Sequence, residues 1–140
     1  MKTPVKTSFA ALLICVLPAF FISCTSDDDK TVGPVPPNHA TIAFEEPTAD
    51  TIITGGEPLP IMGSISSLKG IQGYKIVVRR KSDQAELMVK SFADTDTLVG
   101  FNQSWVNDLS AAADMEVEVV ANLDATGSTA SEKINFQATP

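Results

Sequence analysis

The sequence predicts an all-β domain, a sandwich of two antiparallel sheets that follows a short N-terminal leader. Across residues 41–140, apolar residues alternate with polar ones at a period of two, as in strands that bury one face. No stretch of this region keeps the period of 3.6 residues that an amphipathic helix requires. Turn-forming residues separate the alternating runs at the spacing typical of a sandwich.

Composition limits the classes of function that the chain can have. The 140 residues fit one ordinary domain with a tail, and 44% hydrophobic residues are enough to form a core. The formal charge of −7 has the wrong sign for a non-specific nucleic-acid binder. With two cysteines and one histidine, the chain is a poor candidate for a zinc site, a disulfide scaffold or a histidine-based catalytic triad.

Residues 1–23 are expected to be a secretory signal peptide rather than part of the fold. Lys2 and Lys6 supply a positively charged start, and residues 9–22 form an uncharged apolar run. That run contains Pro18 and is shorter than the roughly 20 residues that a membrane-spanning helix needs.

The end of this leader resembles the lipobox of bacterial lipoproteins. Residues 21–24 (FISC) place the small Ser23 directly before Cys24, the position at which such proteins are cleaved and receive a diacylglyceryl group. The resemblance implies lipidation, with palmitate among the acyl chains, and two such chains anchor a protein stably in a membrane. Cys15 follows the bulky Ile14 and does not fit the pattern. A plain cleaved signal or an uncleaved anchor remains the alternative.

Residues 24–40 are expected to form an acidic, proline-bearing linker. Residues 27–29 (DDD) resemble the surface-export signal of some Gram-negative outer-membrane lipoproteins. This resemblance implies an outer-membrane protein that is displayed on the cell surface, with attachment on the periplasmic face as the alternative. Pro34, Pro36 and Pro37 favour an extended polyproline II stalk.

Seven strands are expected in the remaining chain, and each is justified by alternation, by bounding turns or by both. They are residues 41–46, 58–66, 72–81, 86–92, 97–105, 115–123 and 131–138. Apolar residues occupy every second position in most of them: Ile42 and Phe44; Leu59, Ile61, Gly63 and Ile65; Tyr74, Ile76 and Val78; Met115, Val117, Val119, Ala121 and Leu123; and Ile134, Phe136 and Ala138. Turn signals such as Gly55-Gly56 and Ser82-Asp83 separate the strands. Residues 109–114 (LSAAAD) are expected to form one helical turn.

The domain at residues 41–140 resembles the immunoglobulin-like domains of secreted and surface-attached bacterial lipoproteins. The matching segments are residues 42–47 and 55–58 at the start, residues 61–65 (IMGSI), residues 71–76 (IQGYKI) and residues 117–128, which end in the loop DATGS. The resemblance implies an immunoglobulin-like sandwich used for display, adhesion or spacing rather than for catalysis.

Acidic residues in the predicted loops are candidate calcium ligands. Asp94 and Asp96 lie close together in sequence, and Asp124 lies in another loop. Carboxylate oxygens suit calcium, but the segment lacks the glycine and the distal glutamate of an EF-hand. The alternative is that these aspartates cap turns through their own side chains.

Three other residues are candidate ligand contacts. Trp105, if exposed on a sheet face, would stack on a sugar ring; the alternative is that it fills the core, as is also expected of Tyr74. Arg79 and Lys81 belong to a basic cluster that can bind a carboxylate or sulfate, and alternation places both on the solvent face. The alternative for this cluster is a charged edge that blocks aggregation.

We expect a non-enzymatic module that binds a glycan or a protein at the cell envelope. The chain has no Gly-x-Ser-x-Gly elbow, phosphate loop or His-Glu-x-x-His motif. A structural accessory subunit or spacer of a larger outer-membrane nutrient-uptake or surface assembly is the alternative, and an inhibitor of foreign enzymes is a third. An exposed aromatic or basic patch would favour a binding module, and an open strand edge would favour an accessory subunit.

Overall fold

A computed structural model describes residues 37–140 of the chain. The expected signal peptide, the expected lipidation site Cys24 and most of the expected linker lie outside the described residues. The last residue of that linker, Ala40, opens the first strand.

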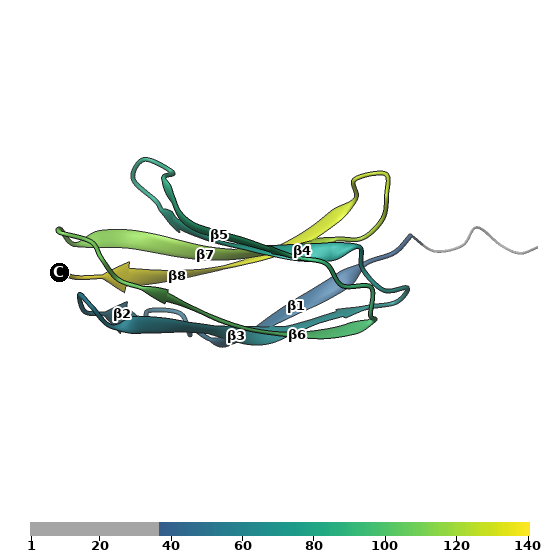
Figure 1. Ribbon diagram of the computed structural model, residues 1–140, viewed down its shortest axis with the longest axis horizontal. Helices are drawn as coiled ribbons and strands as arrows, with labels where there is room; N and C mark the ends of the chain where they lie inside the picture. Colours follow the sequence, from purple (N-terminus) through teal and green to yellow (C-terminus); the bar gives the residue numbers. More distant parts are fainter. Residues whose placement is uncertain (1–36) are drawn as a thin grey trace, which may run out of the picture. The chain divides into compact units, whose positions relative to one another are not determined.

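The described residues form two sheets that pack face to face, with no helix among them (Figure 1). The strands are β1 (Ala40–Glu46), β2 (Ile52–Ile53), β3 (Pro58–Ser67), β4 (Gly73–Arg80), β5 (Glu86–Phe92), β6 (Leu98–Val106), β7 (Ala113–Asn122) and β8 (Thr129–Ala138). The small sheet has the order β1-β3-β6, and the large sheet has the order β2-β8-β7-β4-β5. The predicted all-β sandwich is therefore confirmed.

The strand order is that of an immunoglobulin-like sandwich. Strands β1, β3 and β6 take the places of A, B and E in one sheet, while β4, β7 and β8 take those of C, F and G in the other. Strand β5 extends the second sheet in the place of C′. Among residues 37–140, no strand occupies the place of D, next to β6 in the small sheet.

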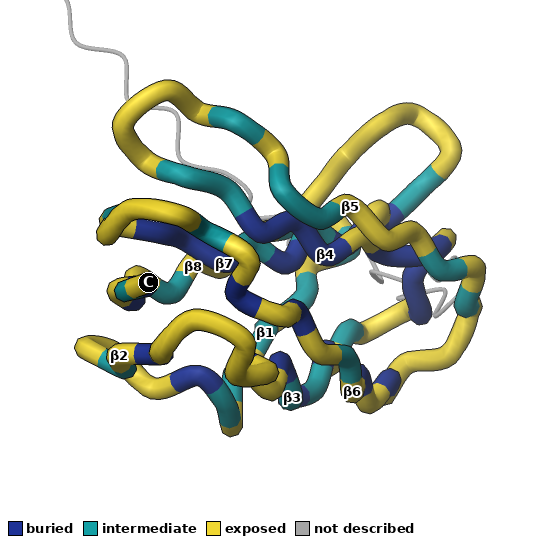
Figure 2. Tube along the Cα trace, turned by 60° about the vertical axis from the view of Figure 1, so that its left-hand side comes forward, coloured by how far each residue is buried: buried dark blue, intermediate teal, exposed yellow. Residues whose placement is uncertain are grey.

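The core lies between the two sheets, where the inward faces of the strands meet (Figure 2). Strand β7 shows why the chain folds this way, because Met115, Val117 and Val119 are fully buried while Glu118 between them faces outward. The other inward positions are likewise apolar: Leu59, Ile61, Ile65, Tyr74, Ile76, Val78, Val99, Phe101, Trp105, Ala121, Phe136 and Ala138. Burying a side chain of this size contributes roughly 1.5–3 kcal/mol.

Two local expectations differ from the structure. The helical turn expected at residues 109–114 is absent, because Ala113 and Asp114 already pair with β8 as the first residues of β7. The preceding loop is held instead by the buried Asn107, whose Nδ2 donates to the Thr139 carbonyl at 2.7 Å and whose Oδ1 accepts from the Leu109 amide at 3.1 Å. The short strand β2 was not expected; it pairs in parallel with the end of β8.

Candidate interaction surface

The free edges of the sandwich are protected very unequally. Strands β1 and β6 flank the small sheet, and β5 and the short β2 flank the large one. Strand β1 carries Glu45 and Glu46 and ends in a register shift before Pro47. Strand β5 carries Glu86 and Lys90 and pairs with β4 across a register shift. Charges and bulges of this kind prevent a second strand from adding to an edge.

Strand β6 has none of these protections. Its sequence, LVGFNQSWV, contains no charged residue and no proline. It pairs with β3 in unbroken register from Ser66↔Leu98 to Pro58↔Val106. Among the edges that the structure describes, β6 is thus a long, regular and uncharged strand with its outer side open.

The backbone of β6 presents hydrogen-bonding groups to that open side. At the two ends of the strand, Ser67 donates to the Thr97 carbonyl at 2.8 Å and the Asn107 amide donates to Glu57 at 3.1 Å. In an antiparallel ladder the bonded positions alternate, so the odd-numbered residues point their backbone groups towards β3. The amides and carbonyls of the even-numbered residues, Leu98 to Val106, therefore point away from the sheet.

The side chains of these same even-numbered residues lie on the outer face of the small sheet. Leu98 is 68% exposed and Val106 is 53% exposed, at opposite ends of the strand, with Gly100, Asn102 and Ser104 between them. The neighbouring strands continue an uncharged face across most of the sheet with Thr41, Ala43, Pro60, Met62, Ser64 and Ser66. We call this combination of the open strand and its outward residues the β6 edge.

The outer face of the large sheet is charged instead, and its charges are paired with one another. The Nη1 atom of Arg79 donates to Glu116 at 2.7 Å and to Glu118 at 3.2 Å, and its Nη2 donates to Glu86 at 3.1 Å. Lys133 reaches the same two β7 carboxylates at 3.2 and 3.7 Å. Arg79 faces outward as predicted, but its side chain is only 14% exposed and three carboxylates already bind it.

These contacts shift the ionisation of the network. Hydrogen bonds to Glu116 and Glu86 hold the pKa of Arg79 above its ordinary value. Burial alone would raise the pKa of Glu116, but the hydrogen bonds from Arg79 and Lys133 outweigh it and lower that pKa. The cluster is therefore charged and self-paired near neutral pH, which leaves little of Arg79 to bind an external anion.

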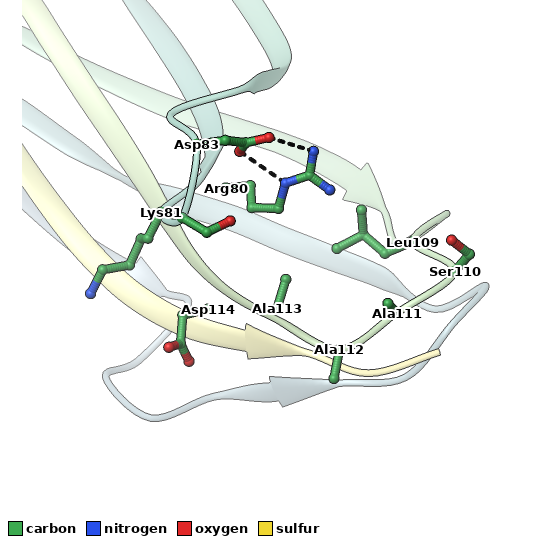
Figure 3. Close-up of a pocket in the computed structure, with 10 residues that line it drawn as sticks. Arg80, Lys81, Asp83, Leu109, Ser110, Ala111, Ala112, Ala113 and Asp114 are labelled. Atoms are coloured by element: carbon green, nitrogen blue, oxygen red, sulfur yellow. Dashed lines mark hydrogen bonds and ion pairs between the residues drawn. The ribbon is translucent and has the colours of Figure 1, made fainter.

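Lys81 follows β4 directly and lies on the rim of an open hollow of about 600 Å³ (Figure 3). The hollow lies between the β4–β5 turn and the segment 109–114, which spans the end of the β6–β7 loop and the start of β7. Arg80 on its rim is paired with Asp83 at 2.8 Å. The exposed lysine is the one member of the predicted basic pair that remains accessible, and its ammonium group points away from the alanines of the hollow (Figure 3).

Both unique aromatic residues are in the core. Trp105 is 6% exposed and packs edge-on against Phe136, with ring centroids 6.1 Å apart. Tyr74 stacks on Phe92 at 4.8 Å. The core-packing alternative is thus correct for both residues, and the expected role of Trp105 as an exposed sugar-stacking residue is wrong in this structure.

Two of the three candidate calcium ligands, Asp94 and Asp124, cap turns through their side chains, and Asp96 donates its amide to the first of them. Asp94 accepts the Asp96 amide at 3.0 Å in the β5–β6 loop. In the β7–β8 loop, Asp124 accepts from the Thr126 hydroxyl at 2.6 Å and from the amides of Thr126 and Ser128, and these bonds strongly lower its pKa. Within residues 37–140, no three acidic, histidine or cysteine side chains are grouped as metal ligands.

Comparison with known proteins finds similarity to solved structures but none to known sequences. No protein-family model and no curated protein sequence matches the chain. Among solved structures, that of murine CRIg is similar, with a TM-score of 0.41 and 15% sequence identity over 72% of this chain and 97% of that one. In the part of the chain that the structure describes, no helix is long and apolar enough to cross a membrane.

Proposed function

We propose that this chain is a lipid-anchored, non-enzymatic protein of the cell envelope that binds another protein chain through its β6 edge. The observation that carries the proposal is the open, uncharged and regularly paired strand at the margin of the small sheet. An extended polypeptide can pair with such an edge through its backbone, and the outward side chains then select the partner. This favours the accessory-subunit alternative over a glycan-binding module.

The surface supports a protein partner better than a glycan. Sugar-binding faces rely on exposed aromatic rings, and the tryptophan and tyrosine of this chain are both buried. The arginine that could have held an acidic sugar is bound by carboxylates of its own sheet. A strand edge, by contrast, offers a row of amides and carbonyls that matches only another strand.

The way in which the chain enters the sandwich is compatible with a tether. Asn38 donates from Nδ2 to the carbonyls of Gly70 at 2.7 Å and Leu123 at 3.1 Å, and its Oδ1 accepts the Lys69 amide at 3.2 Å. These bonds fix the first described residues to the turns at one end of the sandwich.

The anchor makes a first prediction. Cells that express the full chain and are fed labelled palmitate are expected to label the protein, and Cys24→Ala is expected to abolish the label because the acceptor thiol is gone. Cys15→Ala is the matched control and should leave labelling unchanged. Palmitate that persists after Cys24→Ala would disprove attachment at this residue.

The β6 edge makes a second prediction. A photo-crosslinking amino acid placed at Leu98 of the full chain in intact cells is expected to capture a protein, because this side chain lies beside the open strand. The control position is Lys75, which is exposed on the outer face of the large sheet. Equal capture at both positions, or none at Leu98, would contradict binding through this edge.

A further inference from the structure

We infer that the chain which pairs with the β6 edge is a second copy of this protein. The two β6 strands would run antiparallel about a two-fold axis at Asn102, which joins the two small sheets into one continuous sheet. The inference rests on the proposed function, because it names the partner of the same edge.

The backbone of β6 suits this pairing. Asn102 is the middle residue of the strand Leu98–Val106, so a two-fold axis there overlaps the whole strand with its copy. In this arrangement the hydrogen-bonded pairs are formed by the even-numbered residues, whose backbone groups already point outward. Each such pair can exchange two N–H···O bonds in a normal antiparallel ladder. A two-fold interface of this kind is closed, so it makes a dimer and not a fibre.

The outward side chains of β6 follow a similar order from either end of the strand: a large apolar residue, a small residue and then Asn102 at the centre. Under this symmetry, the exposed Leu98 lies opposite the exposed Val106 of the other copy, and Gly100 lies opposite Ser104. Asn102 meets its own copy. Each large apolar side chain thus gains an apolar neighbour directly across the pair, at both ends of the interface.

The place of the missing strand D gives the second copy room. Strand β5 extends the large sheet, and its residues Met88, Lys90 and Phe92 pair with inward-facing residues of β4. Met88 and Phe92 are only partly buried and Lys90 is exposed, with its Nζ bonded to Gln103 of β6 at 2.9 Å. A strand added to β6 lies over this half-covered surface.

Charge also favours a copy of the same chain at this surface. The formal charge of −7 means that two copies repel each other over most of their surfaces. The β6 edge has no charged residue, and Lys90 beside it is a cation bonded to Gln103, so copies that approach there avoid the close contact of carboxylates. The β1 edge carries Glu45 and Glu46, and the β5 edge carries Glu86, so copies that met at either edge would bring carboxylates into the interface.

The test is disulfide trapping in the full chain. Asn102→Cys is expected to form a cross-linked dimer under mild oxidation, because the two Cα atoms of a directly opposed bonded pair lie about 5.5 Å apart, within the range of a disulfide. Leu98→Cys is the matched control on the same strand and face. It should stay monomeric, because its own copy would lie roughly 27 Å away at about 3.4 Å per residue. Asn102→Lys, which sets two like charges opposite each other, should remove the dimer seen by native mass spectrometry.

The outcomes separate this inference from the proposed function. Trapping at Asn102 but not at Leu98 supports the dimer. No trapping at Asn102, with a different protein captured by the crosslinker at Leu98, overturns the dimer and leaves the proposed function standing. No trapping and no capture at the β6 edge overturns both. Equal trapping at the two cysteines overturns the pairing about Asn102.

Discussion

Gly63→Ala is expected to destabilise the domain by about 3 kcal/mol or to prevent it from folding. Gly63 lies in the middle of β3 and pairs with Phe44 on one side and Phe101 on the other. These two rings meet edge-on over the glycine, with centroids 5.7 Å apart. A Cβ atom here would overlap the Ala43 carbonyl oxygen and lie 2.6 Å from the ring tip of Phe101. Backbone of a paired strand cannot move away without breaking the ladder.

Gly100→Ala is the matched control for this effect. Gly100 lies on the neighbouring strand of the same sheet, and a Cβ atom there meets nothing within 4 Å. We expect a change within about 0.5 kcal/mol, as for other surface positions. Urea unfolding of the two variants against the parent chain measures the difference. Similar losses for both would show that the close contact at Gly63 is not responsible for the effect.

The sequence predicts the fold well because burial in a sandwich follows a local rule. Alternation in β7, from Met115 to Ala121, is visible in the sequence and appears unchanged in the structure. Strand β2 escapes this rule because two residues, Ile52 and Ile53, are too few to show a period. At residues 109–114 the alanines suggested a helical turn, but pairing with β8, a non-local contact, decides the structure.

The interaction surface could not be predicted because it depends on strand order. The lack of charge in β6 is plain in the sequence, but only the topology shows that this strand lies at an edge. Arg79 illustrates the same limit. Alternation correctly places it on the solvent face, yet its carboxylate partners come from β5 and β7, distant in sequence or across a turn. Trp105 has no sequence signal that separates a core ring from an exposed one.

Arg79→Ala is expected to cost about 2–3 kcal/mol of folding free energy. Removing one partner of a mostly buried ion pair leaves the remaining charges without compensation, which costs about 3–5 kcal/mol when burial is complete. The loss is smaller here because Lys133 still contacts Glu116 and Glu118. Arg80→Ala is the control, since Arg80 and Asp83 form an exposed pair within one turn, and such pairs are worth about 0–1 kcal/mol. Urea unfolding at neutral pH measures both variants.

The pH dependence of unfolding distinguishes lost ion pairing from lost packing in Arg79→Ala. The pKa of Glu116 is lowered in the folded chain, so its contribution is complete above the pKa of the unfolded state, about 4.3. That contribution disappears as the pH falls through the lower pKa of the folded state. In the variant the pKa of Glu116 should rise, because burial then acts with fewer opposing hydrogen bonds. The stability difference between parent and variant should therefore shrink as the pH is lowered from 7 towards 3. A difference that stays constant over this range would attribute the effect to the lost side-chain volume, and the carboxylates around Arg79 would then contribute little to its stabilising role.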